Sequence, residues 1–270
     1  MSIDLIDIGA NLTHESFSDD LESVLKAASL KNINQLIVTG ADLASSEGAL
    51  KLAQRYPKNL FSTVGIHPHH AEDTNPSVMD QLRKLSVAPQ VKAIGETGLD
   101  YFRDISPRAI QIASFESHIE LAIETGLPLF LHERDSYPAF KNILQSYRDK
   151  LNEVVVHCFT GEKEALHAYL DLDCSIGITG WVCDERRGKH LIPLLKDIPM
   201  DKLMIETDSP YLMPRTMRPK PKSRRNEPQN LIHICQFIAD TLETSYEEIA
   251  CQTTKNAMNF FRLTALNHVN

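Results

Sequence analysis

Four residues of the kinds that bind metal ions each follow a short apolar run of the sequence: Glu96, His132, His157 and Asp208. Two imidazoles with two carboxylates suit a divalent cation, because zinc favours histidine nitrogen while magnesium and manganese favour carboxylate oxygen. Such an ion lowers the pKa of a bound water toward neutrality and polarises the bond under attack. No serine or cysteine triad is evident. As metal ligands, these four residues predict a metal-dependent hydrolase that holds one or two ions.

Further polar residues end neighbouring apolar runs and could act on the substrate. Glu206 stands two residues before Asp208, so both side chains point to the same side of a strand. We expect both to take part in catalysis, with Glu206 either a general base or a buried ion-pair partner. Asn11, His67 and His69 are expected to contact the substrate, although a surface position explains His69 equally well.

Two of the proposed metal ligands also have structural explanations. Glu96, the third predicted catalytic carboxylate, could instead form an ion pair with Arg103 or Arg134. Asp208 could cap a turn before Pro210. Because polar residues end nearly every apolar run, we favour metal binding for both.

A basic segment begins seven residues after Asp208. From Arg215 to Arg225 it carries six basic residues and no acidic one, and prolines stiffen it. If the strands form a barrel, this segment lies beside the metal and predicts an anionic substrate, most simply a phosphate ester. Arg224 and Arg225 are expected to bind it, because arginine suits bidentate contacts with phosphate. The Arg186–Arg187 pair could extend the same rim.

Eight short runs of β-branched and aliphatic residues recur about every thirty residues and alternate with segments of helical periodicity. The runs are Leu5–Ile8, Gln35–Thr39, Phe61–Val64, Val91–Ile94, Leu129–Leu131, Val154–Val156, Cys174–Ile178 and Leu203–Ile205. Apolar strands that alternate with helices imply parallel pairing, in either a closed barrel or an open doubly wound sheet. A count of eight favours closure. We therefore predict an α/β fold, a (β/α)8 TIM barrel that forms a single domain over residues 1–270 and gathers the strand ends on one face.

Composition limits the kind of protein. Of the 270 residues, 42% are hydrophobic and 24% charged, which is typical of a soluble protein with a full core. No apolar stretch approaches the ~20 residues that span a bilayer, and the N-terminus lacks a basic signal region, so we expect a cytoplasmic monomer without membrane contact. Five widely spaced cysteines indicate reduced thiols. The net charge of −8 confines any nucleic-acid contact to a local surface.

Taken together, these residues resemble the TatD-type metal-dependent deoxyribonucleases of the amidohydrolase-like barrel superfamily. The resemblance covers essentially the whole chain and rests on segments that occur in the family's order: Asp7–Asn11, Gly65–His69, Ile94–Asp100, Leu131–Asp135, Val156–Gly161, Gly177–Trp181, Ile205–Tyr211 and Arg224–Pro228. It implies that the four residues named first correspond to metal ligands. Asn226 and Glu227, which follow the two arginines, join them as expected substrate contacts.

The resemblance also implies an activity, the 3′ to 5′ removal of nucleotides from DNA ends with a preference for single strands, and a cofactor, magnesium or a transition-metal ion such as manganese or zinc. RNA stays open as an alternative substrate. The sequence departs from the commoner family pattern on its first strand. Where many relatives carry a His-x-His pair, this chain has Gly9 and Asn11. The loss of two imidazoles favours one firmly held ion, with Mg²⁺ as the first choice.

Two other classes of protein stay open. A hydrolase of a small amide, lactone or aminoacyl ester could use the same metal ligands, although a neutral substrate gives no reason for the basic segment. A non-catalytic accessory protein on the same scaffold is the third alternative, because fold does not determine function.

Overall fold

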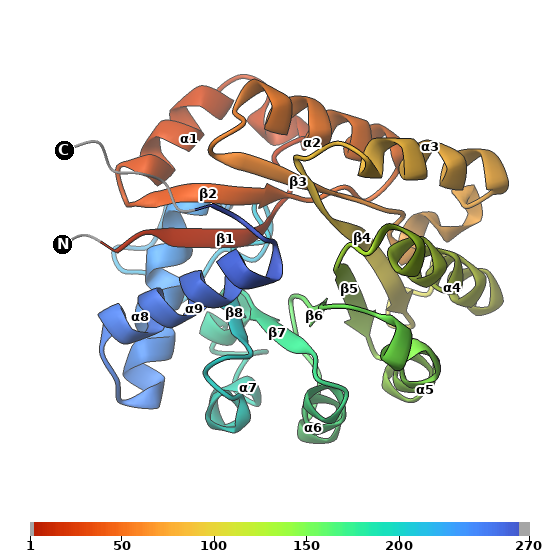
Figure 1. Cartoon of the computed structure of the whole chain (residues 1–270). Helices are drawn as coiled ribbons and strands as arrows, with labels where there is room; N and C mark the ends of the chain where they lie inside the picture. Colours follow the sequence, from red (N-terminus) through yellow and green to blue (C-terminus); the bar gives the residue numbers. More distant parts are fainter. Residues whose placement is uncertain (1–2, 265–270) are drawn as a thin grey trace.

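Eight parallel strands follow one another around a barrel in the computed structural model, which describes residues 3–264 (Figure 1). They are β1 (Leu5–Ala10), β2 (Ile33–Val38), β3 (Leu60–Val64), β4 (Val91–Asp100), β5 (Leu129–Arg134), β6 (Val154–Val156), β7 (Ser175–Ile178) and β8 (Leu203–Ile205). The predicted (β/α)8 barrel is confirmed, and every predicted run overlaps a strand. β4 and β5 extend beyond the apolar runs, because the residues at their C-terminal ends include polar ones.

The barrel closes between β8 and β1, where the pairing is short. Ala10 and Ser209 form a single parallel bridge. Backbone hydrogen bonds run from Asp208 N to Gly9 O (2.8 Å) and from Asn11 N to Ser209 O (2.7 Å). This seam therefore lies at the C-terminal ends of both strands and brings Asn11 beside Asp208.

Helices form a ring outside the strands (Figure 1). They are α1 (Leu21–Ser29), α2 (Leu43–Arg55), α3 (Pro76–Ser86), α4 (Arg108–Thr125), α5 (Tyr137–Tyr147), α6 (Lys163–Asp171), α7 (Leu191–Leu194), α8 (Leu231–Leu242) and α9 (Tyr246–Phe260). Their starts follow local rules, as in α2, where Asp42 and Ser45 form a capping box. Short 3-10 helices occupy several loops, among them η2 (Pro68–Asp73) and η4 (Gly180–Cys183). None of the helices in residues 3–264 has the length and apolar character that a membrane crossing needs.

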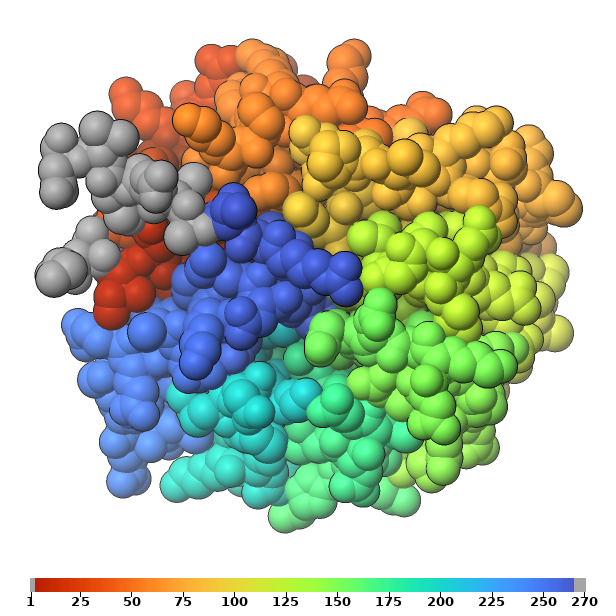
Figure 2. Space-filling view, in the orientation of Figure 1, coloured from red at the N-terminus to blue at the C-terminus, as the bar shows by residue number. Residues whose placement is uncertain are grey.

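The inside of the barrel has an apolar half and a polar half. The apolar half contains Ile6, Ile8, Ile37, Phe61, Phe130 and Met204, packed against Phe260 and Phe261. Thr254 and Asn256 of α9 donate hydrogen bonds to the backbone oxygens of Asp4 and Leu203, at the starts of β1 and β8. α9 thus covers the N-terminal end of the barrel, and Figure 2 shows it in dark blue at the centre of the visible face. The C-terminal end is left to polar side chains.

A bulge in β4 brings Glu96 to this polar end. The register of β4 against β5 shifts after Ile94. Gly95 has a φ of 143°, and a Cβ there would lie 2.1 Å from the backbone oxygen of Phe130, so only glycine fits. Glu96 N leaves the regular ladder and donates to Gly40 O, just beyond β2 (2.7 Å).

Candidate active site at the C-terminal end of the barrel

A cavity of about 510 Å³ opens at the C-terminal ends of the strands. It brings together seven of the residues singled out from the sequence: Asn11, His67, His69, Glu96, His132, His157 and Asp208. They lie at the ends of six different strands or in the loops that follow, and the first and last are 197 positions apart. Their roles stay predictions, which the contacts of each side chain constrain.

Glu96 is the centre of this group. Its Oε1 lies 2.8 Å from His157 Nε2 and 3.0 Å from His132 Nδ1. The Phe130 ring stacks on the His157 ring at 4.3 Å between centroids, so the apolar half of the barrel lies directly beneath the imidazole. Two imidazole nitrogens thus converge on one carboxylate oxygen, a set of donor atoms that would suit a divalent cation. We call Glu96, His132 and His157 the Glu96 cluster.

Glu206 determines where His157 carries its proton. The Oε2 of Glu206 lies 3.3 Å from His157 Nδ1, and its Oε1 accepts a hydrogen bond from Cys158 N (2.5 Å). With a proton held on Nδ1, a metal ion could take the place of the second ring proton on Nε2, which faces Glu96; this is the state that a metal-binding histidine needs. Glu206 is fully buried and is not among the residues that line the cavity. Of its two predicted roles, the buried ion-pair partner fits this position, and a role in catalysis stays a prediction.

Two glycines make the room that the Glu206 carboxylate occupies. A Cβ at Gly9 would lie 2.2 Å from Glu206 Oε2, and a Cβ at Gly177 would lie 2.7 Å from Glu206 Oε1. Both distances are shorter than non-bonded atoms tolerate. Gly9 therefore has a structural role of its own, because only a residue without a Cβ lets the Glu206 carboxylate reach His157.

His67 stands near the same carboxylate, but its proton lies elsewhere. His67, Glu96 and His132 offer ligand atoms within 4.8 Å of one another, close enough to hold an ion. His67 Nδ1, however, accepts a hydrogen bond from His69 N (3.1 Å), which puts the ring proton on Nε2, 3.4 Å from Glu96 Oε1. Burial holds the pKa of His67 well below its usual range, so the ring is neutral. In this state Nε2 is a hydrogen-bond donor, and it would have to lose this proton before it could bind a metal. The expected contact of His67 with substrate stays a prediction.

Asp100 belongs to the site, although the sequence analysis assigned it no role. Its Oδ2 lies 2.7 Å from His69 Nε2 and 3.5 Å from His132 Nε2. It thereby holds His69 in the cavity, where a surface position had been the alternative. The spacing in the sequence could have pointed to Asp100, because residues four apart on a strand, such as Glu96 and Asp100, lie on the same face. The polar end of β4 concealed that the strand continues this far.

Asp208 lies at the seam between β8 and β1, with a φ of 52°. Asn11 Nδ2 donates a hydrogen bond to Asp208 Oδ1 (2.9 Å), so Asn11 positions this carboxylate. Burial, together with the negative charges of Glu96 and Glu206, raises the pKa of Asp208 to about 7. A carboxylate with such a pKa can accept a proton near neutral pH.

A second buried carboxylate, also missed, holds the end of β8. Asp7 Oδ1 accepts a hydrogen bond from Thr207 N (2.9 Å), and Oδ2 accepts one from Thr207 Oγ1 (2.5 Å). Burial raises the pKa of Asp7 to about 7. Asp7 thus fastens the residue that precedes Asp208 to β1.

The charges of the site favour a cation. Burial alone would raise the pKa of Glu96, yet the imidazoles around it, with the hydrogen bonds from His132 and His157, hold it well below its usual range. Burial alone would lower the pKa of His157, yet Glu206 and Glu96 raise it well above its usual range. His132 Nε2 is buried without a hydrogen-bond partner among the described residues. Imidazole nitrogens and buried carboxylates converge here with donor capacity unused, so the residues fit a divalent metal ion.

The end of the basic segment does not line the cavity. Arg225 donates to Ser16 O (2.5 Å) and to both carboxylate oxygens of Asp20 (2.9 and 2.7 Å), and it also pairs with Glu227 (2.7 Å). Arg224 is exposed, and neither Arg224, Arg225 nor Glu227 is among the cavity residues. Arg225 and Glu227 fasten the segment to the start of α1 instead of facing the site. Their expected contact with substrate therefore has no support from their position.

Other residues of the segment are engaged in similar ways. Asn226, expected to meet the substrate, is fully buried, and its Nδ2 donates to Thr207 O (2.9 Å). Arg215 lies 3.9 Å from the carboxylate of Asp184. Side chains that already pair with the protein are poorly placed to attract a phosphate, so the anionic substrate must be argued from other cations.

Those cations lie in the cavity wall. Arg103, Arg134 and Arg187 all line it. Within residues 3–264, Arg103 and Arg134 have no carboxylate at ion-pair distance. The alternative that Glu96 pairs with one of them is wrong, because the Glu96 carboxylate meets histidines. The wall thus offers positive charge to a ligand whose reacting group reaches the Glu96 cluster.

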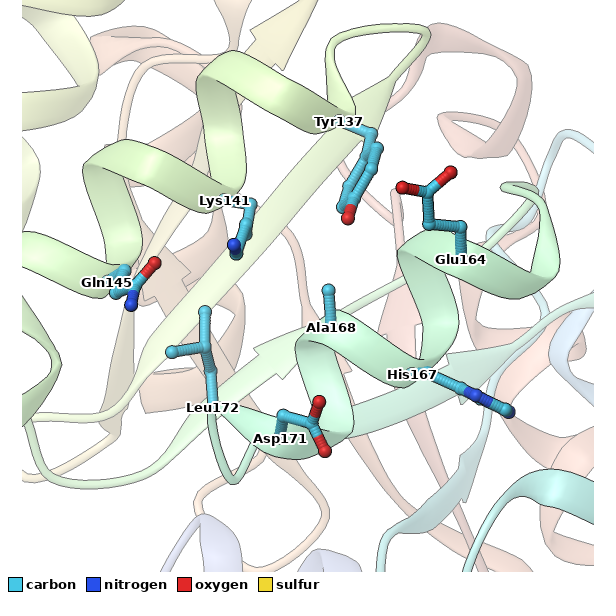
Figure 3. A pocket seen from close by; sticks show the side chains of 8 residues that line it. All are labelled: Tyr137, Lys141, Gln145, Glu164, His167, Ala168, Asp171 and Leu172. Atoms are coloured by element: carbon cyan, nitrogen blue, oxygen red, sulfur yellow. The ribbon is translucent and has the colours of Figure 1, made fainter.

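A second hollow lies outside the barrel, between α5 and α6. Figure 3 shows Tyr137 and Lys141 of α5 facing Ala168 and Asp171 of α6 across a space of about 490 Å³. This hollow is on the helical layer, away from the strand ends where a barrel gathers its catalytic groups. We therefore place the candidate site at the strand ends.

Sequence comparisons place the chain among nucleases. A family model described as "TatD related DNase" matches residues 6–262. The chain is 44% identical over 259 residues to the "3'-5' ssDNA/RNA exonuclease TatD" of Pantoea vagans (strain C9-1), covering 96% of this chain and 100% of the relative. It is 46% identical over 261 residues to the protein of that name from Erwinia billingiae (strain Eb661), covering 97% of this chain and 100% of the relative.

Solved structures agree with the sequence comparisons. A TatD family hydrolase from Entamoeba histolytica superposes with a TM-score of 0.87 at 28% identity, over 98% of this chain and 100% of the other. A TatD homologue from Escherichia coli K12 superposes with a TM-score of 0.88 at 25% identity, over the same shares. A phosphotriesterase homology protein from Escherichia coli shares the fold, with a TM-score of 0.68 at 12% identity over 97% and 99% of the two chains.

Proposed function

The chain belongs to the family of TatD-related DNases, and on this premise we propose that it is a metal-dependent exonuclease that removes nucleotides from the 3′ ends of single-stranded DNA or RNA. One observation carries the proposal on the structural side. Glu96 Oε1 lies 2.8 and 3.0 Å from two imidazole nitrogens in a cavity whose wall carries Arg103 and Arg134, neither of which has a carboxylate partner within residues 3–264. Such a cavity suits a reaction in which a cation and arginines share the charge of a phosphodiester.

We assign the ion to the Glu96 cluster together with Asp208, with Mg²⁺ as the first choice and Mn²⁺ or Zn²⁺ as alternatives. When bound, a divalent cation lowers the pKa of water and neutralises charge that develops on phosphate. One ion fits better than two, because Gly9 supplies no imidazole and Glu206 is engaged with His157 Nδ1 and Cys158 N.

The side chains of the site have separable tasks. Asp208, positioned by Asn11, would orient the attacking water and accept its proton at its carboxylate. Glu206 keeps the proton of His157 on Nδ1. His67 donates a hydrogen bond from Nε2 to an oxygen of the phosphate. Water supplies a hydroxyl group to phosphorus, the bond from phosphorus to the leaving oxygen breaks, and the displaced strand end takes up a proton.

The shape of the site suits one end of one strand. A cavity of about 510 Å³ is in the range of small-molecule pockets, a size that suits a terminal nucleotide. All residues of the site come from one barrel, so we propose that the chain works as a monomer.

Nucleotide release from a single strand tests this function. The protein is stripped with a chelator, reloaded with Mg²⁺, Mn²⁺ or Zn²⁺, and incubated with a 5′-labelled single-stranded oligonucleotide. We expect products that shorten one nucleotide at a time from the 3′ end, no products in the chelator, and elemental analysis that finds about one ion per chain.

Variants connect the activity to the site. His132→Ala and Asp208→Ala should each abolish activity, because each removes a proposed metal ligand. His167→Ala is the matched control, since this exposed histidine pairs with Asp197 on the protein surface (2.9 Å). Activity that survives both site substitutions together would overturn the assignment, as would label released from the 5′ end first.

A further inference from the structure

Aromatic rings and arginine side chains alternate beside the cavity. The guanidinium carbon of Arg134 lies 4.1 Å from the centre of the Phe102 ring and 5.2 Å from that of the Trp181 ring. The guanidinium carbon of Arg187 lies 4.1 Å from the Trp181 ring. Phe102 follows β4, Arg134 ends β5, and Trp181 and Arg187 come after β7. We call these four residues the rim stack.

The rim stack leads outward from the Glu96 cluster. Arg134, Trp181 and Arg187 line the same cavity as His132. Arg134 is two residues beyond His132 on β5, so the two side chains share a face and Arg134 stands about 7 Å nearer the C-terminal end of the strand. Phe102, which contacts Arg134, is 56% exposed. The four residues thus continue the cavity to the surface.

The packing of the protein does not account for this arrangement. A phenylalanine that served the core would be buried. Arg134 has no carboxylate partner in the described part of the chain, and the buried indole nitrogen of Trp181 has no hydrogen-bond partner there. Only Arg187 is paired, with Asp184 at 2.9 Å. An exposed ring beside a cation that has no carboxylate partner in the described part of the chain suits a ligand that has flat faces and negative charges.

We propose that the rim stack binds the nucleotides next to the one being removed. A base stacks on the exposed ring of Phe102, and Arg134 meets the phosphates of the strand as it leaves the cavity, while Arg187, held by Asp184, supports the Trp181 ring. This inference rests on the proposed exonuclease function and adds a binding track outside the reaction centre. Every base has a face that can stack, so the track tolerates any sequence, and only an unpaired strand can offer that face to Phe102.

Trp181 allows binding to be measured directly, because it is the only tryptophan of the chain. In the presence of a chelator, which prevents cleavage, the single-stranded octamer (dT)8 should quench its fluorescence, and a blunt-ended duplex should not. Phe102→Ala should raise the dissociation constant for (dT)8 about tenfold, and Phe102→Tyr should not. Arg134→Gln should reduce the slope of log Kd against log salt concentration by about 0.7.

Ile105 provides the matched control. It lies on the same loop as Phe102 and is 60% exposed, so Ile105→Ala also removes an exposed apolar side chain from that loop. We expect its dissociation constant for (dT)8 to equal that of the wild type. If (dT)8 leaves Trp181 fluorescence unchanged, or if Phe102→Ala and Ile105→Ala bind equally well, the rim stack is not a binding track.

Cleavage kinetics separate this inference from the function on which it rests. With metal present, Phe102→Ala should raise KM for (dT)8 about tenfold and leave kcat/KM for thymidine 5′-p-nitrophenyl phosphate unchanged, because that substrate has no neighbouring nucleotide. A wild-type protein that cleaves neither substrate contradicts the exonuclease function. A wild-type protein that cleaves both, with a Phe102→Ala variant impaired equally on both, leaves the function intact and overturns the rim stack.

Discussion

Replacing Gly9 by alanine tests how the site is built. A Cβ at residue 9 would lie 2.2 Å from Glu206 Oε2, whereas ordinary van der Waals contact begins at 3.4 Å. The carboxylate must therefore retreat by the difference between these distances, about 1.2 Å, unless β1 moves. From the displaced position it cannot keep its present contacts with both His157 Nδ1 and Cys158 N.

The size of this displacement allows an estimate of how much metal affinity and activity the variant loses. Removing a group that orients a metal ligand costs about 10- to 100-fold in metal affinity or activity. Misplacing a group of a catalytic site by about 1 Å costs on the order of 100-fold. We therefore expect Gly9→Ala to lower both metal affinity and kcat/KM by about 10- to 100-fold, or roughly 1.4 to 2.7 kcal/mol.

Calorimetric titration with Mn²⁺ and release of nucleotides from a labelled single strand measure the two losses. Glu206→Gln should reproduce them, and the double variant should be no worse than either single one, because both changes act on the same contact. Gly48→Ala is the control, since Gly48 lies within α2 and a Cβ there meets only the side chain of Thr13 (3.1 Å). Wild-type metal affinity in Gly9→Ala, or losses that add in the double variant, would refute the reasoning.

Two predictions concern the scaffold. His118 accepts a hydrogen bond from Ile66 N (3.0 Å) and donates to Ser114 O (2.7 Å), and burial lowers its pKa from 6.5 to about 4. Because the folded-state pKa is the lower one, the stabilisation is complete above about pH 6.5 and is lost as pH falls toward 4, by on the order of 3 kcal/mol. The free energy of unfolding measured in urea should therefore depend less on pH for His118→Gln than for the wild type. Equal pH dependence in the two proteins would contradict this prediction. Arg225 fastens the basic segment to Asp20 at the start of α1, so Arg225→Gln should lower the melting temperature by about 2–4 °C without changing KM for single-stranded DNA. Arg224→Gln is the control and should leave the melting temperature unchanged. Scanning calorimetry measures both, and an unchanged melting temperature in Arg225→Gln would contradict the stabilising role of the Arg225–Asp20 contact.

The barrel could be predicted because its signal is local. Each strand is buried on both faces, so it reads as a short apolar run wherever it occurs, and helical stripes separate the runs. Strand ends were predicted less well where the strand continues into polar residues. Glu96 and Asp100 both lie on β4, beyond the apolar run that ends at Ile94, so the strand was expected to end too early and Asp100 was missed.

The site could be predicted in part for the same reason. Glu96, His132, His157 and Asp208 each follow an apolar run, and parallel strands of a barrel deliver such residues to one face. The basic segment gave an expectation that the structure does not support, namely that Arg224 and Arg225 contact the substrate. A run of arginines in the sequence does not reveal which of them form ion pairs within the protein. Arg225 meets Asp20, 205 positions away, only in the folded chain.

By itself, the sequence determined which residue types stand at the strand ends, and therefore the kind of chemistry. Only the tertiary structure decided how each one is held: Glu206 reaches His157 Nδ1 through the space left by Gly9, and His67 Nδ1 accepts a hydrogen bond from His69 N. The physical reason is distance along the chain. Strand and helix periods arise from neighbouring residues and can be read locally, whereas closure of the barrel joins β1 to β8, and no periodicity in the sequence encodes the contacts made across that seam.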